Sequence, residues 1–303
     1  ITKKYGADIL RLWAASVDYQ ADCSMSEAIL KQISENYRKV RNTFRFLLAN
    51  INCEEDFSRT DLVDPASLPP LDQYMLVLLN EVNERCQQAY REYRFSDVTT
   101  MLTNLMTNDL SAYYLDYTKD ILYIERKDAP RRRQVQTVLY HATDVLVRLW
   151  APILVHTAEE VNDFFKTEEE SIHLGRFAPK TEIAQAEVLR QKVDRLMQIR
   201  SDIFKALEEA RADKVIGKSL EAEVRLHVSA EDRALIEELC DDQFHQWLIV
   251  SKVTLTEENL KDYGSCQVEI GACKGTVCPR CWNISEQTDE NGLCPRCHQV
   301  LGL

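Results

Sequence analysis

Apolar positions recur every three or four residues through the first 165 residues, and this period predicts a series of amphipathic helices. The first runs from about Ser24 to Ile51, where Ser24 and Glu27 have the spacing of a capping box. A loop is expected from about Cys53 to Pro70. Further helices are predicted over residues 71–93, from Ser96 as N-cap, from Pro130 as a first-turn proline, and over residues 157–165. These helices predict a bundle that forms one domain over residues 24–180, preceded by a linking segment of residues 1–23.

The hydrophobic period changes in the second half of the chain. A helix is predicted over residues 182–212, and residues 220–228 then alternate between apolar and polar, as a half-buried strand does. A further helix is predicted over residues 231–239, and two short strands over residues 251–255 and 267–270. We therefore expect a mainly α fold: a helical bundle, a small α/β module over residues 181–273, and a C-terminal zinc ribbon over residues 274–303.

Length and composition fit a globular chain of about two domains. The 303 residues are 45% hydrophobic and 28% charged, which is enough to bury a sizeable core. The longest apolar stretch, residues 146–155, contains Arg148 and Pro152, so we expect no membrane span. We expect no signal peptide, because Ile1 to Gly6 is polar and cationic with no apolar core behind it. The first residue is not Met, and we expect the chain to be part of a longer one.

Ten cysteines are unevenly placed along the chain. Six lie in the last 38 residues, and four of these form two Cys-Pro-Arg-Cys motifs. Each CxxC turn lets two thiolates reach one ion, and two turns complete a tetrahedral site without an open position. The metal ligands that we predict are Cys278, Cys281, Cys294 and Cys297. We expect one structural Zn²⁺ in a reduced, cytoplasmic protein, and two redox pairs are the alternative.

Aromatic and basic residues lie next to the predicted zinc site. Trp282 follows the first CxxC turn, and Arg280 and Arg296 lie within the two turns. An aromatic ring beside guanidinium groups suits stacking on an unpaired base of RNA. Alternatively, Trp282 covers the small core of the ribbon.

A second basic feature lies on the first long helix. At 100° per residue, one stripe of that helix carries Arg38, Arg41, Asn42 and Arg45. Such a stripe can contact phosphates or base edges, and a solvated helix face is the alternative. The net charge of −12 argues against nucleic acid for the chain as a whole, but a local basic face can still bind phosphate.

Familiar catalytic motifs are missing from this sequence. It has no HExxH motif, no nucleophile elbow and no glycine-rich dinucleotide loop. We therefore predict no catalytic residue in this chain.

Several segments together resemble bacterial isoleucyl-tRNA synthetases. They are KYGADILRLW at residues 4–13, YRKVRNTFRFLL at 37–48, LDYTKD at 115–120, VIGKSLEA at 215–222, CPRCW at 278–282 and LCPRC at 293–297. The resemblance spans almost the whole chain in the order of the family. It implies that the bundle is of the anticodon-binding type found in class I synthetases.

The resemblance also implies that separate domains of the full enzyme carry out catalysis, editing and tRNA binding. That enzyme attaches isoleucine to its tRNA with ATP, and an editing domain hydrolyses mischarged valine. The HIGH-type and KMSKS-type signatures of its nucleotide-binding domain do not occur here. We expect this chain to bind the anticodon stem-loop of tRNA(Ile) as a monomer, with isoleucine and ATP bound only by the absent catalytic domain.

Two further readings stay open at this point. The chain is alternatively a free-standing zinc-ribbon protein that binds RNA or regulates, built from synthetase parts. In a third reading, the zinc only holds the C-terminus together and the contacts with tRNA lie elsewhere.

Overall fold

The computed structural model describes residues 1–51 and 56–303 and divides the chain into two compact units. The first, called the helical unit here, comprises Ile1–Leu68, Met75–Asp116 and Arg133–Ala184. The second, called the C-terminal unit, comprises Pro69–Tyr74, Tyr117–Arg132 and Gln185–Leu303. The units therefore interleave along the chain, whereas the sequence suggested four consecutive segments, whose boundaries remain a prediction. Cys53, at the start of the expected loop, lies outside the described residues.

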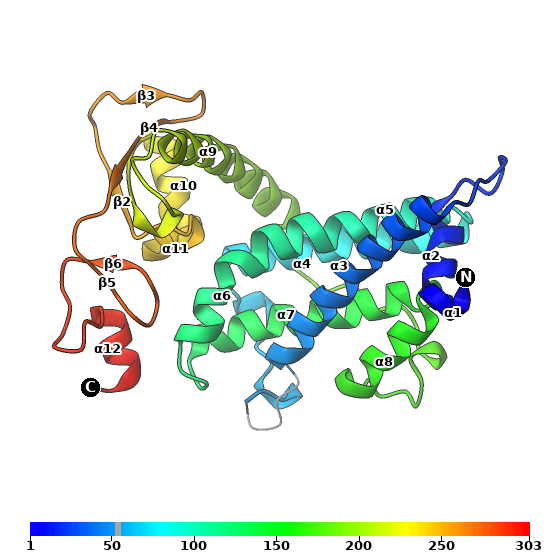
Figure 1. Cartoon of the computed structure of the whole chain (residues 1–303). Coiled ribbons are helices and arrows are strands. Elements are labelled where there is room, and N and C mark those ends of the chain that lie inside the picture. Colours follow the sequence, from blue (N-terminus) through cyan, green and yellow to red (C-terminus); the bar gives the residue numbers. More distant parts are fainter. Residues whose placement is uncertain (52–55) are drawn as a thin grey trace. The chain divides into compact units, whose positions relative to one another are not determined.

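Long helices make up most of the helical unit (Figure 1). The elements are α1 (Thr2–Tyr5), α2 (Ala7–Ser16), α3 (Glu27–Ile51), α4 (Pro70–Arg91), α5 (Phe95–Asn104), the π-helical η3 (Leu105–Tyr114), α6 (Leu115–Ile124), α7 (Pro130–Trp150) and α8 (Val155–Phe165). Helix α2 packs against α3, α5 and α8. Short 3₁₀ turns, η1 (Arg59–Asp61), η2 (Pro65–Ser67) and η4 (Ile172–Leu174), lie in the connections. The prediction of a mainly helical fold is confirmed.

Two predicted helix starts are wrong in detail. Ser26, not Ser24, caps α3, since the backbone N–H of Ile29 donates to Ser26 Oγ at 3.2 Å. Ser96 lies inside the first turn of α5, whose N-cap is Arg94, without a side-chain cap. Helix α7 does begin at Pro130, as predicted.

The helix after Asn104 continues in a π-helical register that the sequence did not predict. The hydroxyl of Ser111 donates to the carbonyl of Met106, five residues earlier, at 2.7 Å. Leu110 and Tyr114 stay fully buried in this segment. Segments of π-helix are rare and occur mostly within α-helices, as this one does between α5 and α6.

The C-terminal unit combines a long helix with a small mixed sheet (Figure 1). Its elements are α9 (Ala186–Ala212), η5 (Ser219–Glu221), β1 (Ala222–His227), α10 (Ala230–Cys240), η6 (Asp241–Gln243), α11 (Phe244–Trp247), β2 (Lys252–Leu255), β3 (Lys261–Asp262), β4 (Gln267–Ala272), β5 (Thr276–Val277), β6 (Ile284–Ser285) and α12 (Pro295–Leu301). Strand order is β2-β1-β4-β3, with β1 parallel to β2 and antiparallel to β4. Alternate residues of β1, including Val224 and Leu226, are buried, as the period of two predicted. The small α/β module is confirmed.

The length and hydropathy of a helix decide whether it can span a membrane. Across residues 1–51 and 56–303, no helix is both long and apolar enough to cross a membrane.

A buried carboxylate joins α2 to the start of α8. Asp8 is only 6% exposed and accepts hydrogen bonds from the backbone N–H groups of Thr157, at 2.8 Å, and His156, at 3.3 Å. The hydroxyl of Thr157 donates to the same carboxylate at 2.7 Å. The first turn of a helix has N–H groups without helical partners, and a carboxylate satisfies them. Asp8 therefore fixes the segment that carries GADIL onto α8.

We expect Asp8→Ala to lower the free energy of unfolding of the helical unit by about 1–3 kcal/mol, because it leaves buried N–H donors without acceptors. The measurement is the midpoint of thermal unfolding followed by far-ultraviolet circular dichroism. Asp163→Ala removes an exposed carboxylate from α8 itself and should leave the midpoint almost unchanged. Equal midpoints for both variants would contradict the role given to Asp8.

Candidate metal centre and nucleic-acid interface

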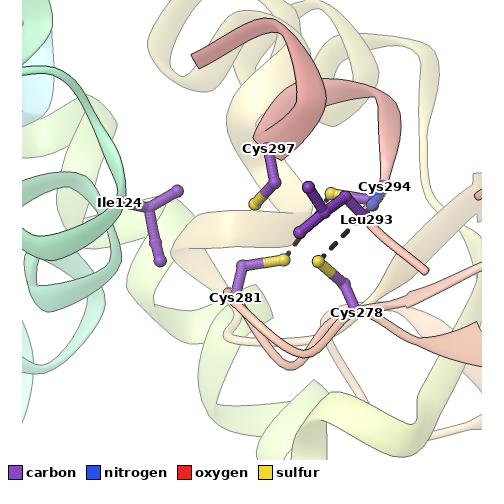
Figure 2. Packing of buried hydrophobic residues seen from close by; sticks show 6 residues of the cluster. All are labelled: Ile124, Cys278, Cys281, Leu293, Cys294 and Cys297. Carbon is purple, nitrogen blue, oxygen red and sulfur yellow. Dashed lines mark hydrogen bonds between the residues drawn. The ribbon is translucent and has the colours of Figure 1, made fainter. Parts of the chain in front are cut away.

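Four cysteine thiols meet in the C-terminal segment, as the spacing of the two motifs predicted. Cys278, Cys281, Cys294 and Cys297 are buried, and their sulfur atoms all lie within 4.8 Å of one another. Figure 2 shows the four side chains turned toward one another, and the sulfurs of Cys281 and Cys294 are 3.7 Å apart. Four sulfurs that bind Zn²⁺ tetrahedrally at about 2.3 Å lie about 3.8 Å apart. The cluster can therefore hold a metal ion with all four positions filled by protein.

Backbone hydrogen bonds give each CxxC motif its turn. In the first, Trp282 N–H donates to Cys278 O at 2.9 Å, and Cys278 N–H donates to Asn283 O at 2.9 Å. In the second, Cys294 is the N-cap of α12, and its N–H donates to the sulfur of Cys278 at 3.4 Å. The two turns are thus joined by an N–H···S hydrogen bond, in addition to contributing two cysteines each to the four-thiol cluster.

The chain between the two motifs reverses direction at Gly292. This glycine has φ 75°, a left-handed conformation that suits a residue without Cβ. Asp289 Oδ1 accepts the N–H groups of Asn291 and Leu293, each at 2.8 Å, and so stabilises the turn. The twelve residues between the motifs are therefore sufficient to bring the second pair of thiols back to the first.

The thiols differ in how easily they ionise. Burial raises the pKa of Cys281 to about 11 and also raises that of Cys297. Burial acts in the same direction on Cys278, but backbone hydrogen bonds from Cys281, Cys294 and Arg280 oppose it and bring the pKa to about 6. Four adjacent thiolates need a compensating cation, and a coordinated metal ion deprotonates its thiols.

Two apolar side chains cover the thiols. Ile124, from the end of α6, and Leu293 form a buried cluster with the four cysteines (Figure 2). Ile124 belongs to the part of α6 that lies in the C-terminal unit. The ribbon therefore packs on a residue from far away in the sequence.

Arg296 joins the ribbon to the same end of α6. Its Nε and Nη2 atoms donate to Glu125 Oε1 at 2.9 and 2.6 Å, and Nη1 pairs with Asp120. Asp120 also accepts a hydrogen bond from the side chain of Gln246 in α11. Burial acts against the charge of Arg296, but the two carboxylates outweigh it and raise its pKa. The guanidinium predicted to contact tRNA thus already holds the ribbon to α6.

Trp282 and Arg280 differ from Arg296 in having no such partners. Trp282 is 69% exposed, so its ring does not cover the ribbon core. Its φ of 66° places it at the left-handed turn of the first motif. Arg280 is half-buried, and its Nη1 atom is buried without a hydrogen-bond partner in the described part of the chain. The exposed ring of Trp282 can therefore contact a further molecule.

The stripe on α3 also contains both paired and unpaired side chains. Arg41 forms a bidentate pair with Glu160 of α8, with Nη1 2.7 Å from Oε2, and Arg38 pairs with Glu35. Asn42 and Arg45 are exposed, and neither makes a side-chain hydrogen bond or ion pair with residues 1–51 or 56–303. The stripe belongs to the helical unit and the ribbon to the C-terminal unit. Arg45 is the residue of the stripe whose charge is most available.

Sequence reasoning missed the residues that anchor the ribbon. Asp120, Ile124 and Glu125 lie in a helical stretch whose acids resemble those of any solvated helix. Nothing in the sequence linked them to Arg296.

Comparison with known proteins defines the class. A family model described as "Anticodon-binding domain of tRNA ligase" matches residues 72–226, so the chain belongs to this family. Over 310 residues it is 43% identical to isoleucine–tRNA ligase 1 of Oceanobacillus iheyensis, covering 99% of this chain and 33% of the relative. The isoleucine–tRNA ligase of Bacillus mycoides is 44% identical over 313 residues, covering 99% of this chain and 34% of the relative.

A third relative gives the same picture. The isoleucine–tRNA ligase of Bacillus subtilis is 42% identical over 302 residues, covering 97% of this chain and 32% of the relative. The resemblance to bacterial isoleucyl-tRNA synthetases, predicted from the sequence motifs, is confirmed. The chain spans about a third of the length of the curated relatives that it matches.

Arg296→Ala should loosen the ribbon, because it leaves two partly buried carboxylates without their cation. We expect the amides of the ribbon to lose about 1–3 kcal/mol of protection in hydrogen exchange, with the metal content unchanged. Arg126→Ala is the matched control, since Arg126 is exposed and pairs with the exposed Asp128 at 3.3 Å. If both variants protect the ribbon as the wild type does, Arg296 is not its anchor.

Proposed function

We propose that this chain is the tRNA-recognition portion of an isoleucine–tRNA ligase, and that it contacts the anticodon stem-loop of tRNA(Ile). The observation that carries the proposal is the match to the anticodon-binding family over residues 72–226, together with 42–44% identity to isoleucine–tRNA ligases. In this proposal the whole protein attaches isoleucine to its tRNA with ATP in the cytoplasm. The chain itself carries no catalytic step and acts as a monomer.

Base recognition falls to the ribbon in this proposal. The exposed ring of Trp282 offers a face on which an unpaired base stacks, and such stacking contributes about 1–3 kcal/mol per base. Arg280 lies in the same CxxC turn, and its half-buried guanidinium adds positive charge beside the ring for a phosphate or base edge. Arg296 serves this site indirectly, by holding the ribbon to α6.

Phosphate contacts fall to the stripe on α3. Arg45 and Asn42 are free to contact the RNA backbone, with Arg38 beside them and only weakly held by the exposed Glu35. Arg41 contributes less, because Glu160 already occupies both Nη atoms of its guanidinium. Contacts of this kind position the RNA and carry no sequence information.

We also propose that the metal of the four-cysteine site is one structural Zn²⁺. The four-sulfur donor set, the sulfur spacing and the absence of an open position suit zinc in a structural role. When bound, the ion fixes both CxxC turns. The residues of the ribbon then present Trp282 and Arg280 on one small, rigid element.

We expect metal analysis of the purified chain to give about one zinc per chain. Cys278→Ser should abolish tight metal binding, while Cys273→Ser, a half-buried neighbour outside the cluster, should keep it. Removal of the metal by a chelator should expose the ribbon amides to exchange and leave the circular dichroism of the helices almost unchanged. Full metal content in Cys278→Ser would contradict the site, and two disulfides without metal would favour the redox alternative.

The function is tested by the affinity of the metal-loaded chain for a tRNA(Ile) transcript and for the same transcript with one anticodon base changed. We expect a preference of about tenfold for the cognate transcript, which is about 1.4 kcal/mol. Trp282→Ala should lower the cognate affinity by about 1–3 kcal/mol without changing the metal content. Phe164→Ala, which removes another exposed aromatic ring, on α8, should have no effect.

Each other result of this experiment has a clear reading. Equal affinity for both transcripts would remove base recognition from this chain. Unchanged binding in Trp282→Ala would remove the stacking role and favour a ribbon that is purely structural. No binding to either transcript would contradict the proposal that this portion recognises tRNA by itself.

A further inference from the structure

The turn from α4 to α5 carries a cluster of aromatic side chains within the helical unit. The ring of Phe95 lies 6.3 Å from Tyr19, 6.2 Å from Tyr90 and 6.1 Å from Tyr93, measured between centroids. Phe177 stacks on Tyr90 at 5.6 Å. Two of the rings remain open to solvent, Tyr19 at 54% and Tyr93 at 66%. The cluster therefore supports two exposed aromatic faces on a helical scaffold.

Beside this cluster lies a cavity of about 410 Å³. Its lining comprises Arg85, Gln88, Arg94, Asp97, Thr100 and Met101. Asp97 is the acid among them, and it pairs with Arg94, which also donates to Glu92 at 2.7 Å. Its volume falls within the range of ligand sites, about 300–1,000 Å³. The cavity is thus lined mainly by hydrogen-bond donors, and Arg94 shares its single positive charge between Asp97 and Glu92.

The two arginines of the cavity have complementary properties. Arg94 is held in place by its two carboxylate partners. Arg85 is exposed and makes no side-chain hydrogen bond or ion pair with the described residues. Arg85 can therefore bind an anion without displacing a carboxylate, and the guanidinium fork matches the geometry of phosphate.

Charge around the cavity is locally positive, although the chain has a net charge of −12. Arg91 lies on the same helix end, and its Nη1 donates to the neutral side chain of Gln88, at 3.4 Å. Arg176 precedes the stacked Phe177 and is exposed. The nearby Glu84 is paired with Lys180 at 2.8 Å. An anionic partner therefore meets an attractive field at this corner.

We propose that the α4–α5 corner is a second RNA-binding surface, distinct from the ribbon and from the stripe on α3. A backbone phosphate binds the free guanidinium of Arg85 at the cavity, and a neighbouring ribose or unpaired base packs on Tyr93. Phosphate-binding guanidiniums next to an exposed aromatic ring suit RNA better than a protein partner. The identity of the RNA as tRNA rests on the proposed function.

The test uses the metal-loaded chain and fluorescence anisotropy with both tRNA transcripts over a range of salt concentrations. Arg85→Gln should lower the affinity about tenfold, as expected for the loss of one charge-assisted hydrogen bond. The effect should be the same for both transcripts, and the slope of log K against log salt should fall by about one. Arg233→Gln removes a charge paired only with the exposed Glu257 and should change neither quantity.

A second variant separates binding from folding. Tyr93 has φ 58°, and Asn tolerates this left-handed conformation better than Tyr does. Tyr93→Asn should therefore fold at least as well as the wild type. It should bind both transcripts about tenfold more weakly, as expected for one lost stacking contact, with an unchanged salt slope.

The remaining outcomes separate this surface from the proposed function. If the wild type prefers cognate tRNA and both variants bind like it, the surface proposal fails and the proposed function stands. If Arg85→Gln weakens binding equally but the wild type has no anticodon preference, the surface stands and base recognition fails. Unchanged RNA binding with altered self-association would assign the corner to a second copy of the chain, and no RNA binding at all would overturn both proposals.

Discussion

Convergence of four thiols is the constraint on which the C-terminal segment depends. Around them are two strands of two residues each and the seven-residue α12, too little structure to bury a core. The apolar residues Val277, Leu301 and Leu303 are exposed. What is buried is the cysteine cluster with Leu293 and Ile124. The place of every other ribbon side chain, Trp282 included, therefore follows from the geometry of the sulfurs.

Arginines in this protein fall into two groups, according to whether a carboxylate already occupies the guanidinium. Arg296, Arg41 and Arg94 are paired, and each joins or orders elements of its own unit. Arg45 and Arg85 are not paired in the described part of the chain, and they face solvent. Paired guanidiniums stabilise the fold, because a phosphate must displace a carboxylate to bind them. Free guanidiniums are available to bind phosphate. A free arginine lies near a paired one in two places: Arg85 near Arg94 at the α4–α5 corner, and Arg45 near Arg41 on α3.

Local patterns carried most of what the sequence could predict. The helical period, the alternation in β1 and the spacing of the four cysteines depend on neighbours a few residues apart. The pairs of Arg296 join residues 171 and 176 positions apart, and an arginine reads the same in a sequence whether paired or free. The predicted N-cap of α3 was wrong for a related reason. Ser24 and Ser26 both qualify by type, and the path of the chain into the helix selects Ser26.

An acidic chain that binds RNA is not a contradiction once pairing is considered. Screening limits charge interactions to about 8 Å at physiological salt, so a phosphate responds to its immediate neighbours and not to the total of −12. Many of the acidic side chains near the basic features already form ion pairs with arginines, as Glu160 does with Arg41 and Asp97 with Arg94. The acids elsewhere repel RNA that approaches any other face. RNA is then held only where free cations and exposed rings coincide, and a surface of this kind favours few binding orientations over many.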